Sequence, residues 1–309
     1  MKNLFLVILF FWFIFTVNAL SLSLKETEKA CDENLSNMAC LEIATRYLVG
    51  KDLTKDQNKA IELFNKVCDN KLSLGCSLFG DNYLSGEYLE KNYQKYIYYY
   101  TKACEYDDRD ACFELAEEYK TGKKIKQDYN KSIYFYTKAC DLNNSNGCYK
   151  LGNNYFDGKG IKQDYNKAIE LYKKVTRLGD SKGSMAIGSM YYRGEGVSQD
   201  YEKAVEFLTK ACNKGNQRSC KALAVEYTLG KVIKQDYSKA FKLFSKLCDE
   251  KVVTSCFDLA RMHYLGQGTK KDYTKACKLF NQTCDDGLME GCKTAKAIKN
   301  NDNNKTKKK

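Results

Sequence analysis

The sequence predicts an all-α protein, an α/α solenoid of helix–loop–helix repeats whose turns are stapled by disulfides. Three observations predict this fold: a period of 36 residues without a slip from Cys40 to Cys292, apolar residues at helical spacing within each period, and a cysteine pair in nearly every period. A fixed period of this length is typical of stacked helical repeats, because one helix pair cannot bury its apolar face alone.

The first helix of each repeat follows the second cysteine of a pair. After Cys148, for example, Leu151, Gly152 and Tyr155 stand at spacings of 3, 4 and 7, which is one face of an α-helix. Gly158 then ends the helix, since glycine tolerates the left-handed conformation. The other repeats end this helix at Gly50, Gly86, Gly122, Gly194, Gly230 and Gly266.

The second helix of each repeat begins after a lysine-rich loop. Asp164 stands where its side chain can cap the free N–H groups, and a buried stripe follows within residues 168–175. The corresponding capping positions are Asp56, Asn92, Asp128, Asp200, Asp236 and Asp272. Seven complete units are expected at about residues 40–284, inside a solenoid of residues 20–299 that includes terminal caps. Residues 300–309, NNDNNKTKKK, predict a disordered basic tail.

The amino terminus has the features of a signal peptide over residues 1–19. Met1 and Lys2 precede an apolar run of 14 residues, Leu4 to Val17, and Ala19 lies near a suitable cleavage site. An uncleaved anchor is the alternative, but this run is shorter than the roughly 20 residues that span a bilayer. We therefore expect a secreted or periplasmic bacterial protein with no membrane span after cleavage.

The segment from Gly147 to Lys174, GCYKLGNNYFDGKGIKQDYNKAIELYKK, resembles the Sel1-like repeat, a relative of the tetratricopeptide repeat. The resemblance covers nearly the whole mature chain and implies a right-handed superhelix of α-hairpins. With a cysteine pair in each turn, the chain is similar to the Helicobacter-type cysteine-rich proteins, which are described as penicillin-binding and assigned as beta-lactamases. The resemblance thus implies beta-lactam hydrolysis, although no catalytic motif of that family transfers to residues of this sequence.

The cysteines of each pair face one another across a tight helix–helix turn, which suits a disulfide. The predicted pairs are Cys31–Cys40, Cys68–Cys76, Cys104–Cys112, Cys140–Cys148, Cys212–Cys220, Cys248–Cys256 and Cys284–Cys292. One repeat has Thr176 and Ser184 instead, so both partners are lost together. The spacing is too long for a zinc site and the chain has one histidine, so we expect neither a metal nor another cofactor.

Cys277 and His263 break the pattern. Cys277 takes a position that is aliphatic elsewhere and predicts a buried free thiol, with an intermolecular disulfide as the alternative. His263 replaces the repeat tyrosine and is expected in the core rather than as a catalytic base.

Catalytic motifs are not evident. Ser-x-x-Lys is absent, and Lys120-Thr121-Gly122, which spells a Lys-Thr-Gly motif of penicillin-binding enzymes, coincides with an ordinary helix end. Whether the chain is an enzyme stays open at this point.

A non-enzymatic binding module is the alternative function. Tyr98 and Tyr134 stand where other second helices carry Glu or Lys, and two exposed aromatics one repeat apart would form a ligand platform. Polar positions of the first helices predict a groove that holds an extended peptide or a carboxylate. These positions are Asn82, Asn153, Asn154, Glu117 and Glu118. Local packing and a merely solvated face are the competing interpretations.

The formal charge of +12 lies largely in the loops and the tail. After export, such charge favours anionic envelope or host surfaces over nucleic acid. The expected partners are a peptide, a cell-wall fragment, a beta-lactam or a host protein, with no nucleic acid, and the protein is expected to be a monomer.

Overall fold

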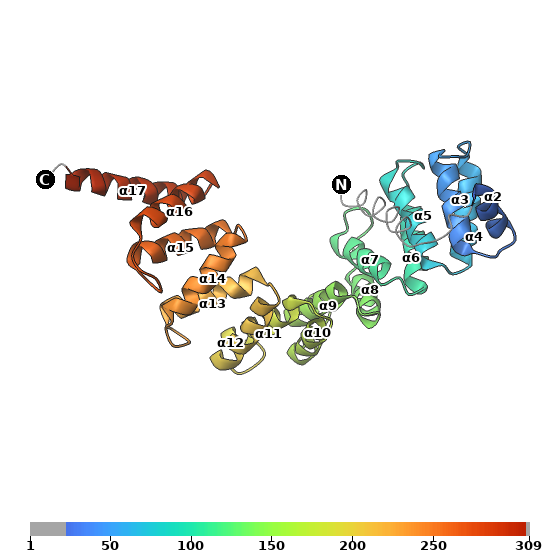
Figure 1. Ribbon diagram of the computed structural model, residues 1–309. Helices are drawn as coiled ribbons and strands as arrows, with labels where there is room; N and C mark the ends of the chain where they lie inside the picture. The colour runs from blue at the N-terminus through green and yellow to red at the C-terminus, as the bar shows by residue number, and fades with distance from the viewer. Residues whose placement is uncertain (1–22, 307–309) are drawn as a thin grey trace. The chain divides into compact units, whose positions relative to one another are not determined.

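The computed structural model describes residues 23–306, which form 16 helices, α2 to α17, and no strand within that range (Figure 1). The chain divides into two compact units, one up to Leu142 and one from Asn143 onward. The predicted signal peptide, residues 1–19, lies outside the described residues, as do residues 307–309 of the predicted tail.

Each helix of a repeat is 13 residues long, and successive helices within a unit lie side by side (Figure 1). The first unit contains α2 (Leu24–Asp32), α3 (Asn37–Val49), α4 (Gln57–Asp69), α5 (Ser73–Ser85), α6 (Tyr93–Glu105), α7 (Arg109–Thr121) and α8 (Tyr129–Asp141). The second contains α9 (Ser145–Asp157), α10 (Tyr165–Arg177), α11 (Ser181–Arg193), α12 (Tyr201–Asn213), α13 (Gln217–Leu229), α14 (Tyr237–Asp249), α15 (Val253–Leu265), α16 (Tyr273–Asp285) and α17 (Met289–Thr306).

These helices confirm the repeat architecture. Odd-numbered helices from α3 to α15 are the first helices, which we call A helices, and even-numbered helices from α4 to α16 are the second, or B, helices. Helices α2 and α17 flank the seven pairs as caps. Helix α17 continues through residues 300–306, where the sequence predicts a disordered tail. Residues 300–306 are mostly Asn and Asp, which are weak helix formers, so intrinsic helix propensity does not explain this extension.

The predicted helix signals act as expected. The Asp164 side chain accepts a hydrogen bond from the backbone N–H of Lys167, and Gly158 ends α9 with a φ of 67°. Gly152 is small for a packing reason, because a Cβ at this position would lie 2.7 Å from a ring carbon of Tyr172. The large–small pair of Leu151 and Gly152 therefore lets the A and B helices of one repeat approach closely.

Disulfides join the end of a B helix to the start of the next A helix. Six of the predicted pairs have Cα–Cα separations of 4.5 to 4.8 Å. These are Cys31–Cys40, Cys68–Cys76, Cys104–Cys112, Cys212–Cys220, Cys248–Cys256 and Cys284–Cys292. Cys140 and Cys148 lie on either side of the boundary between the two units, and their pairing stays a prediction here. This number of disulfides indicates an oxidising compartment.

Where the cysteine pair is missing, hydroxyl groups take its place. Thr176 Oγ1 lies 3.2 Å from Ser184 Oγ and donates to the backbone carbonyl of Tyr172 at 3.0 Å. Cys277 is partly buried in α16 and packs against the core cluster that contains Phe280.

His263 is buried, as the sequence predicts, and packs edge-on against Phe241 with 5.2 Å between ring centroids. Burial lowers the pKa of His263, with a smaller contribution from Lys275. Gly122, with a φ of 65°, ends α7 after Lys120 and Thr121, which agrees with the interpretation of these three residues as a helix end.

Candidate functional site

Tyrosine hydroxyls from B helices hold acceptors on A helices in three consecutive repeats. Tyr100 donates to Asp81 at 2.6 Å, and Tyr172 donates to Asn153 at 2.7 Å. Tyr136 donates to Glu117 in the same way. In each pair the tyrosine follows its acceptor by 19 residues, so the repeat geometry itself builds the contact.

The remaining repeats lack both the tyrosine and its acceptor. Their B helices carry Phe64, Leu208, Phe244 and Phe280 at the tyrosine position, and their A helices carry Thr45, Ser189, Val225 and Arg261 at the acceptor position. Tyrosine thus occurs where an acid or amide acceptor occurs. A buried phenol needs a hydrogen-bond partner, which explains why the two positions change together.

In the first unit the acceptors are the carboxylates of Asp81 and Glu117. Burial raises the pKa of Asp81, and the hydrogen bond from Tyr100 partly offsets that shift. Burial likewise raises the pKa values of Tyr100 and Tyr136, so both phenols stay protonated donors. The hydrogen bonds from Tyr100 and Tyr136 therefore restrict the orientation of the Asp81 and Glu117 carboxylates.

Two further carboxylates on α7 extend this acidic surface. Partial burial, and then the charges of Glu117 and Glu118, raise the pKa of Glu114. Lys124 forms an ion pair with Glu118 and lies 5.6 Å above the Tyr96 ring. We call Asp81, Glu114, Glu117 and Glu118 the acidic face of the first unit.

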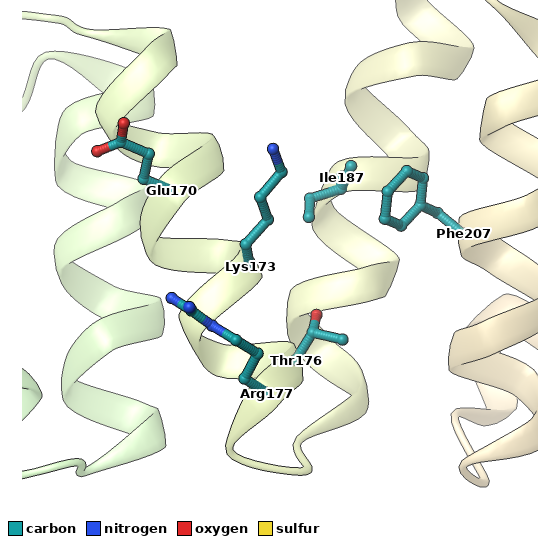
Figure 2. A pocket seen from close by; sticks show the side chains of 6 residues that line it. All are labelled: Glu170, Lys173, Thr176, Arg177, Ile187 and Phe207. Atoms are coloured by element: carbon teal, nitrogen blue, oxygen red, sulfur yellow. The ribbon is translucent and has the colours of Figure 1, made fainter.

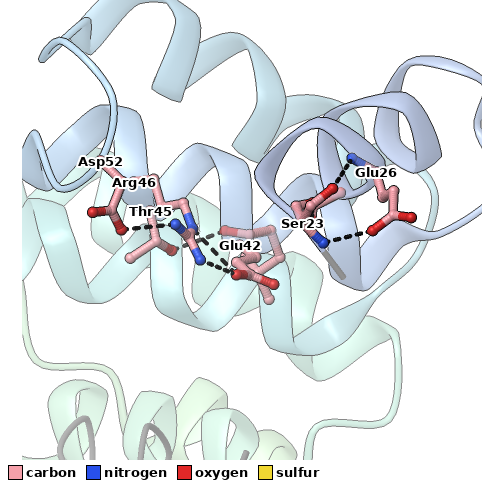
Figure 3. A network of polar contacts seen from close by, with 8 residues as sticks. Ser23, Glu26, Glu42, Thr45, Arg46 and Asp52 are labelled. Atoms are coloured by element: carbon pink, nitrogen blue, oxygen red, sulfur yellow. Dashed lines mark hydrogen bonds and ion pairs between the residues drawn. The ribbon is translucent and has the colours of Figure 1, made fainter. Parts of the chain in front are cut away.

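In α3, the positions equivalent to Glu114 and Glu118 carry one acidic and one basic residue. Glu42 and Arg46 occupy the places that Glu114 and Glu118 take in α7. Arg46 pairs with Glu42 at 2.7 Å and with Asp52 at 2.8 Å (Figure 3). In α7 a second carboxylate replaces this arginine, so like charges lie one helical turn apart. Repulsion between these two carboxylates is unfavourable, and a cationic partner would reduce it.

Tyr98 and Tyr134, predicted as a ligand platform, lie on the B helices α6 and α8 and are 52% and 54% exposed. Each packs edge-on against its neighbour in sequence, Tyr99 or Phe135. Lys102 and Lys138 lie 5.1 and 5.5 Å above the two rings. The described contacts join neither tyrosine to the other, nor to the A-helix residues predicted for the groove.

The predicted asparagines serve local structure. The Asn82 amide donates to the Leu78 carbonyl of its own helix at 2.8 Å, and the Asn153 side chain accepts from Tyr172. Asn154 is 5% exposed, so the expectation that it faces a groove is wrong. Its position lies on the side of α9 that packs into the core. Glu117 and Glu118, in contrast, belong to the acidic face.

Sequence reasoning missed Asp81, Glu114 and the supporting tyrosines. The sequence does contain a pattern that indicates these contacts. Every repeat with a tyrosine at this B-helix position has an acid or amide residue 19 positions earlier, and the other repeats have neither. Among the side chains of residues 23–299, no group of three or more His, Cys, Asp and Glu residues could hold a metal ion.

Stacked A/B helix pairs closed by disulfides define the class, a cysteine-stapled α/α repeat protein. The family model described as "Sel1 repeat" matches residues 37–72, 74–107, 109–144, 145–180, 182–216, 217–251 and 253–288. The chain therefore belongs to the Sel1 repeat family. No curated protein matches the sequence. No helix in the described part of the chain has the length and apolar character required to cross a membrane.

Solved structures share this fold. A protective antigen of uropathogenic Escherichia coli is 25% identical, with a TM-score of 0.74 over 88% of this chain. The chain spans 58% of the length of that protein. A Sel1 repeat protein from Oxalobacter formigenes is 19% identical, with a TM-score of 0.74 over 89% of this chain and 79% of its own. Cysteine rich protein B of Helicobacter pylori is 36% identical over 44% of this chain and 97% of its own, with a TM-score of 0.35.

Proposed function

We propose that the protein is an exported, non-enzymatic interaction scaffold that binds a cationic, extended segment of a protein partner on the acidic face of its first unit. The observation that carries the proposal is the support of Asp81 and Glu117 by the hydroxyls of Tyr100 and Tyr136. Carboxylates that are already held by a hydrogen bond lose little conformational entropy on binding, which favours recognition of a partner side chain.

Charge distribution supports a cationic partner. The protein as a whole has a formal charge of +12, yet α7 places three glutamates within five residues, from Glu114 to Glu118. Lys124 already pairs with Glu118 on this face, which shows that the face accepts a lysine side chain. An extended chain bearing Lys or Arg matches the negative charge that Glu114, Glu117 and Glu118 concentrate on α7. Export is part of the proposal, because disulfides persist in oxidising compartments and the first 19 residues have signal-peptide character.

The test is binding of a fluorescent peptide of alternating lysine and alanine to the full oxidised chain. Glu114→Gln/Glu118→Gln should weaken binding by roughly tenfold, about 1.4 kcal/mol. Glu90→Gln/Glu105→Gln is the matched control, because it removes the same charge from exposed positions of the same unit. Equal weakening by the two double variants would show that only overall charge matters and would contradict the proposal.

Beta-lactam hydrolysis is the function implied by the cysteine-rich relatives, and the described geometry does not favour it. Lys221 donates to Thr254 Oγ1 at 2.6 Å, but this lysine–hydroxyl pair is exposed to solvent. Incubation of the oxidised protein with a chromogenic beta-lactam separates the two functions. Turnover or a covalent adduct would replace the scaffold proposal.

A further inference from the structure

A cavity of about 490 Å³ opens in the second unit between α10, α11 and α12. Its lining residues are Glu170, Lys173, Thr176, Arg177, Ile187 and Phe207 (Figure 2). This volume falls in the range of small-molecule sites in proteins. The cavity belongs to a different unit from the acidic face and is independent of the proposed function.

The walls of this cavity differ in character. Ile187 and Phe207, from α11 and α12, supply an apolar side, whereas α10 supplies the charged side chains (Figure 2). Lys173 and Arg177 lie one helical turn apart on α10, and Glu170 precedes them by one turn. Two cations and one carboxylate leave a single net positive charge. Within the described residues, neither Lys173 nor Arg177 forms an ion pair, so the lining has a net positive charge. The Arg177 guanidinium and the Glu170 carboxylate point away from Ile187 and Phe207, and Lys173 extends along α10 (Figure 2).

The two cations are departures from the repeat. The other B helices carry Asn65, Thr101, Thr137, Thr209, Ser245 and Asn281 at the position of Lys173. They carry Asp69, Glu105, Asp141, Asn213, Asp249 and Asp285 at the position of Arg177. Arg177 therefore reverses the charge that the repeat usually places here. Since the repeat folds without cations at either position, the fold itself does not require them.

The same repeat has also lost its disulfide. Thr176 lines the cavity and its Oγ1 contacts Ser184 Oγ at 3.2 Å, where the neighbouring repeats have two sulfur atoms. Lys214, another cation that the other repeats lack at this position, donates to the Thr176 carbonyl at 3.2 Å. A hydroxyl offers a hydrogen-bonding oxygen, which a disulfide does not. Lys173, Thr176 and Arg177, which all depart from the repeat, thus line the same cavity.

We propose that this cavity binds a small monocarboxylate with an apolar or aromatic body. The carboxylate pairs with Lys173 and with Arg177, because an ammonium and a guanidinium are the usual partners of a carboxylate. Binding requires the exposed Arg177 side chain to turn from the orientation in Figure 2 towards the cavity. The apolar body packs against Ile187 and Phe207. Glu170 disfavours a second negative charge on the ligand, which selects a monocarboxylate over a phosphate or a dicarboxylate.

The probe is 4-phenylbutyrate, titrated calorimetrically into the full oxidised chain. Its amide, 4-phenylbutyramide, has the same apolar body without charge, and inorganic phosphate has charge without the apolar body. We expect 4-phenylbutyrate to bind at least roughly tenfold more tightly than either. Equal binding of the amide, tighter binding of phosphate, or no binding of 4-phenylbutyrate would overturn the proposal.

Variants that copy the neighbouring repeats test the residues. Arg177→Asp introduces the residue found at Asp69 and Asp249, and Lys173→Thr introduces the residue found at Thr101, so both are compatible with the fold. Each should weaken 4-phenylbutyrate binding by roughly tenfold. Arg218→Asp, an exposed position on α13 outside the cavity, makes the same charge change as Arg177→Asp. If Arg218→Asp weakened binding as much as Arg177→Asp, the assignment to this cavity would be wrong.

Discussion

The hydroxyl of Tyr100 donates a hydrogen bond to Oδ1 of Asp81 at 2.6 Å, joining the B helix α6 to the A helix α5 of the same repeat. Desolvation is the largest influence on this carboxylate and raises its pKa, and the tyrosine offsets part of that effect. The pair thus combines a buried donor with a charged acceptor at a fixed place in the repeat. Its two residues can be changed separately.

Removing the hydroxyl should be costly where the acceptor is charged. Tyr100→Phe leaves the Asp81 carboxylate without its donor, and we expect a loss of about 1–3 kcal/mol in the free energy of unfolding. Tyr172→Phe is the matched control, since its acceptor Asn153 is neutral. Urea unfolding at neutral pH measures both. An equal or larger loss for Tyr172→Phe would show that the charge of Asp81 is irrelevant.

The pH dependence of stability should report the partly buried carboxyl group of Asp81. Because the folded pKa of Asp81 is raised, the folded state binds its proton more tightly than the unfolded state, whose ordinary value is 3.8. The unfavourable contribution of the charged carboxylate is full above the folded pKa and vanishes as the pH falls below 3.8. Asp81→Asn keeps an acceptor for Tyr100, as Asn153 does for Tyr172, and should be neutral or stabilising at neutral pH.

The measurement is the free energy of unfolding of wild type and Asp81→Asn from neutral to acidic pH. The difference in favour of the variant should shrink as the pH falls through the folded pKa of Asp81. A constant difference across this range would mean that Asp81 does not titrate with folding.

His263 should respond to acid in the opposite sense. Burial lowers its folded pKa below the ordinary 6.5, so the unfolded state binds the proton more tightly and stability is lost as the pH falls below 6.5. Nδ1 of His263 is buried and has no hydrogen-bond partner among the described residues. His263→Tyr restores the residue of the other repeats and should raise stability by about 1–3 kcal/mol. Thermal unfolding between pH 7 and 5 should show the gain increasing towards pH 5, and a gain that shrinks instead would contradict the buried, neutral histidine.

The turn that has Thr176 and Ser184 in place of a cysteine pair should accept an engineered disulfide. In the double variant Thr176→Cys/Ser184→Cys, the new cysteines occupy positions whose counterparts in other repeats lie 4.5 to 4.8 Å apart at Cα. We expect a disulfide that adds roughly 2–3 kcal/mol on the chain-entropy model for a loop of this size. Thiol titration of the denatured protein and urea unfolding measure the bond and its effect. Two persistently reactive thiols would show that the turn of this repeat differs from its neighbours.

Much of the fold was predictable because the same helix-capping, helix-ending and cysteine positions recur from repeat to repeat. Asp164 and Gly158 mark the ends of helices in every copy, and cysteines 8 residues apart, such as Cys104 and Cys112, can meet only across a short turn. The site was harder to predict. Asn153 and Asn154 are adjacent polar residues in the sequence, yet one accepts a tyrosine hydroxyl and the other is buried. Helix rotation separates neighbours by about 100°, and only packing decides which side is covered.

The sequence alone thus determined the class of fold, the ends of the repeat helices and six of the cysteine pairs, because local propensity, capping and period all act over short distances. The tertiary structure decided which polar residues meet. Asp81 contacts Tyr100, and Lys173 and Arg177 lie beside Ile187 and Phe207, only because whole helices stack. The burial that raises the pKa of Asp81 is a product of helix packing. The cavity beside Arg177 is lined by helices of two successive repeats and has no counterpart in an isolated repeat.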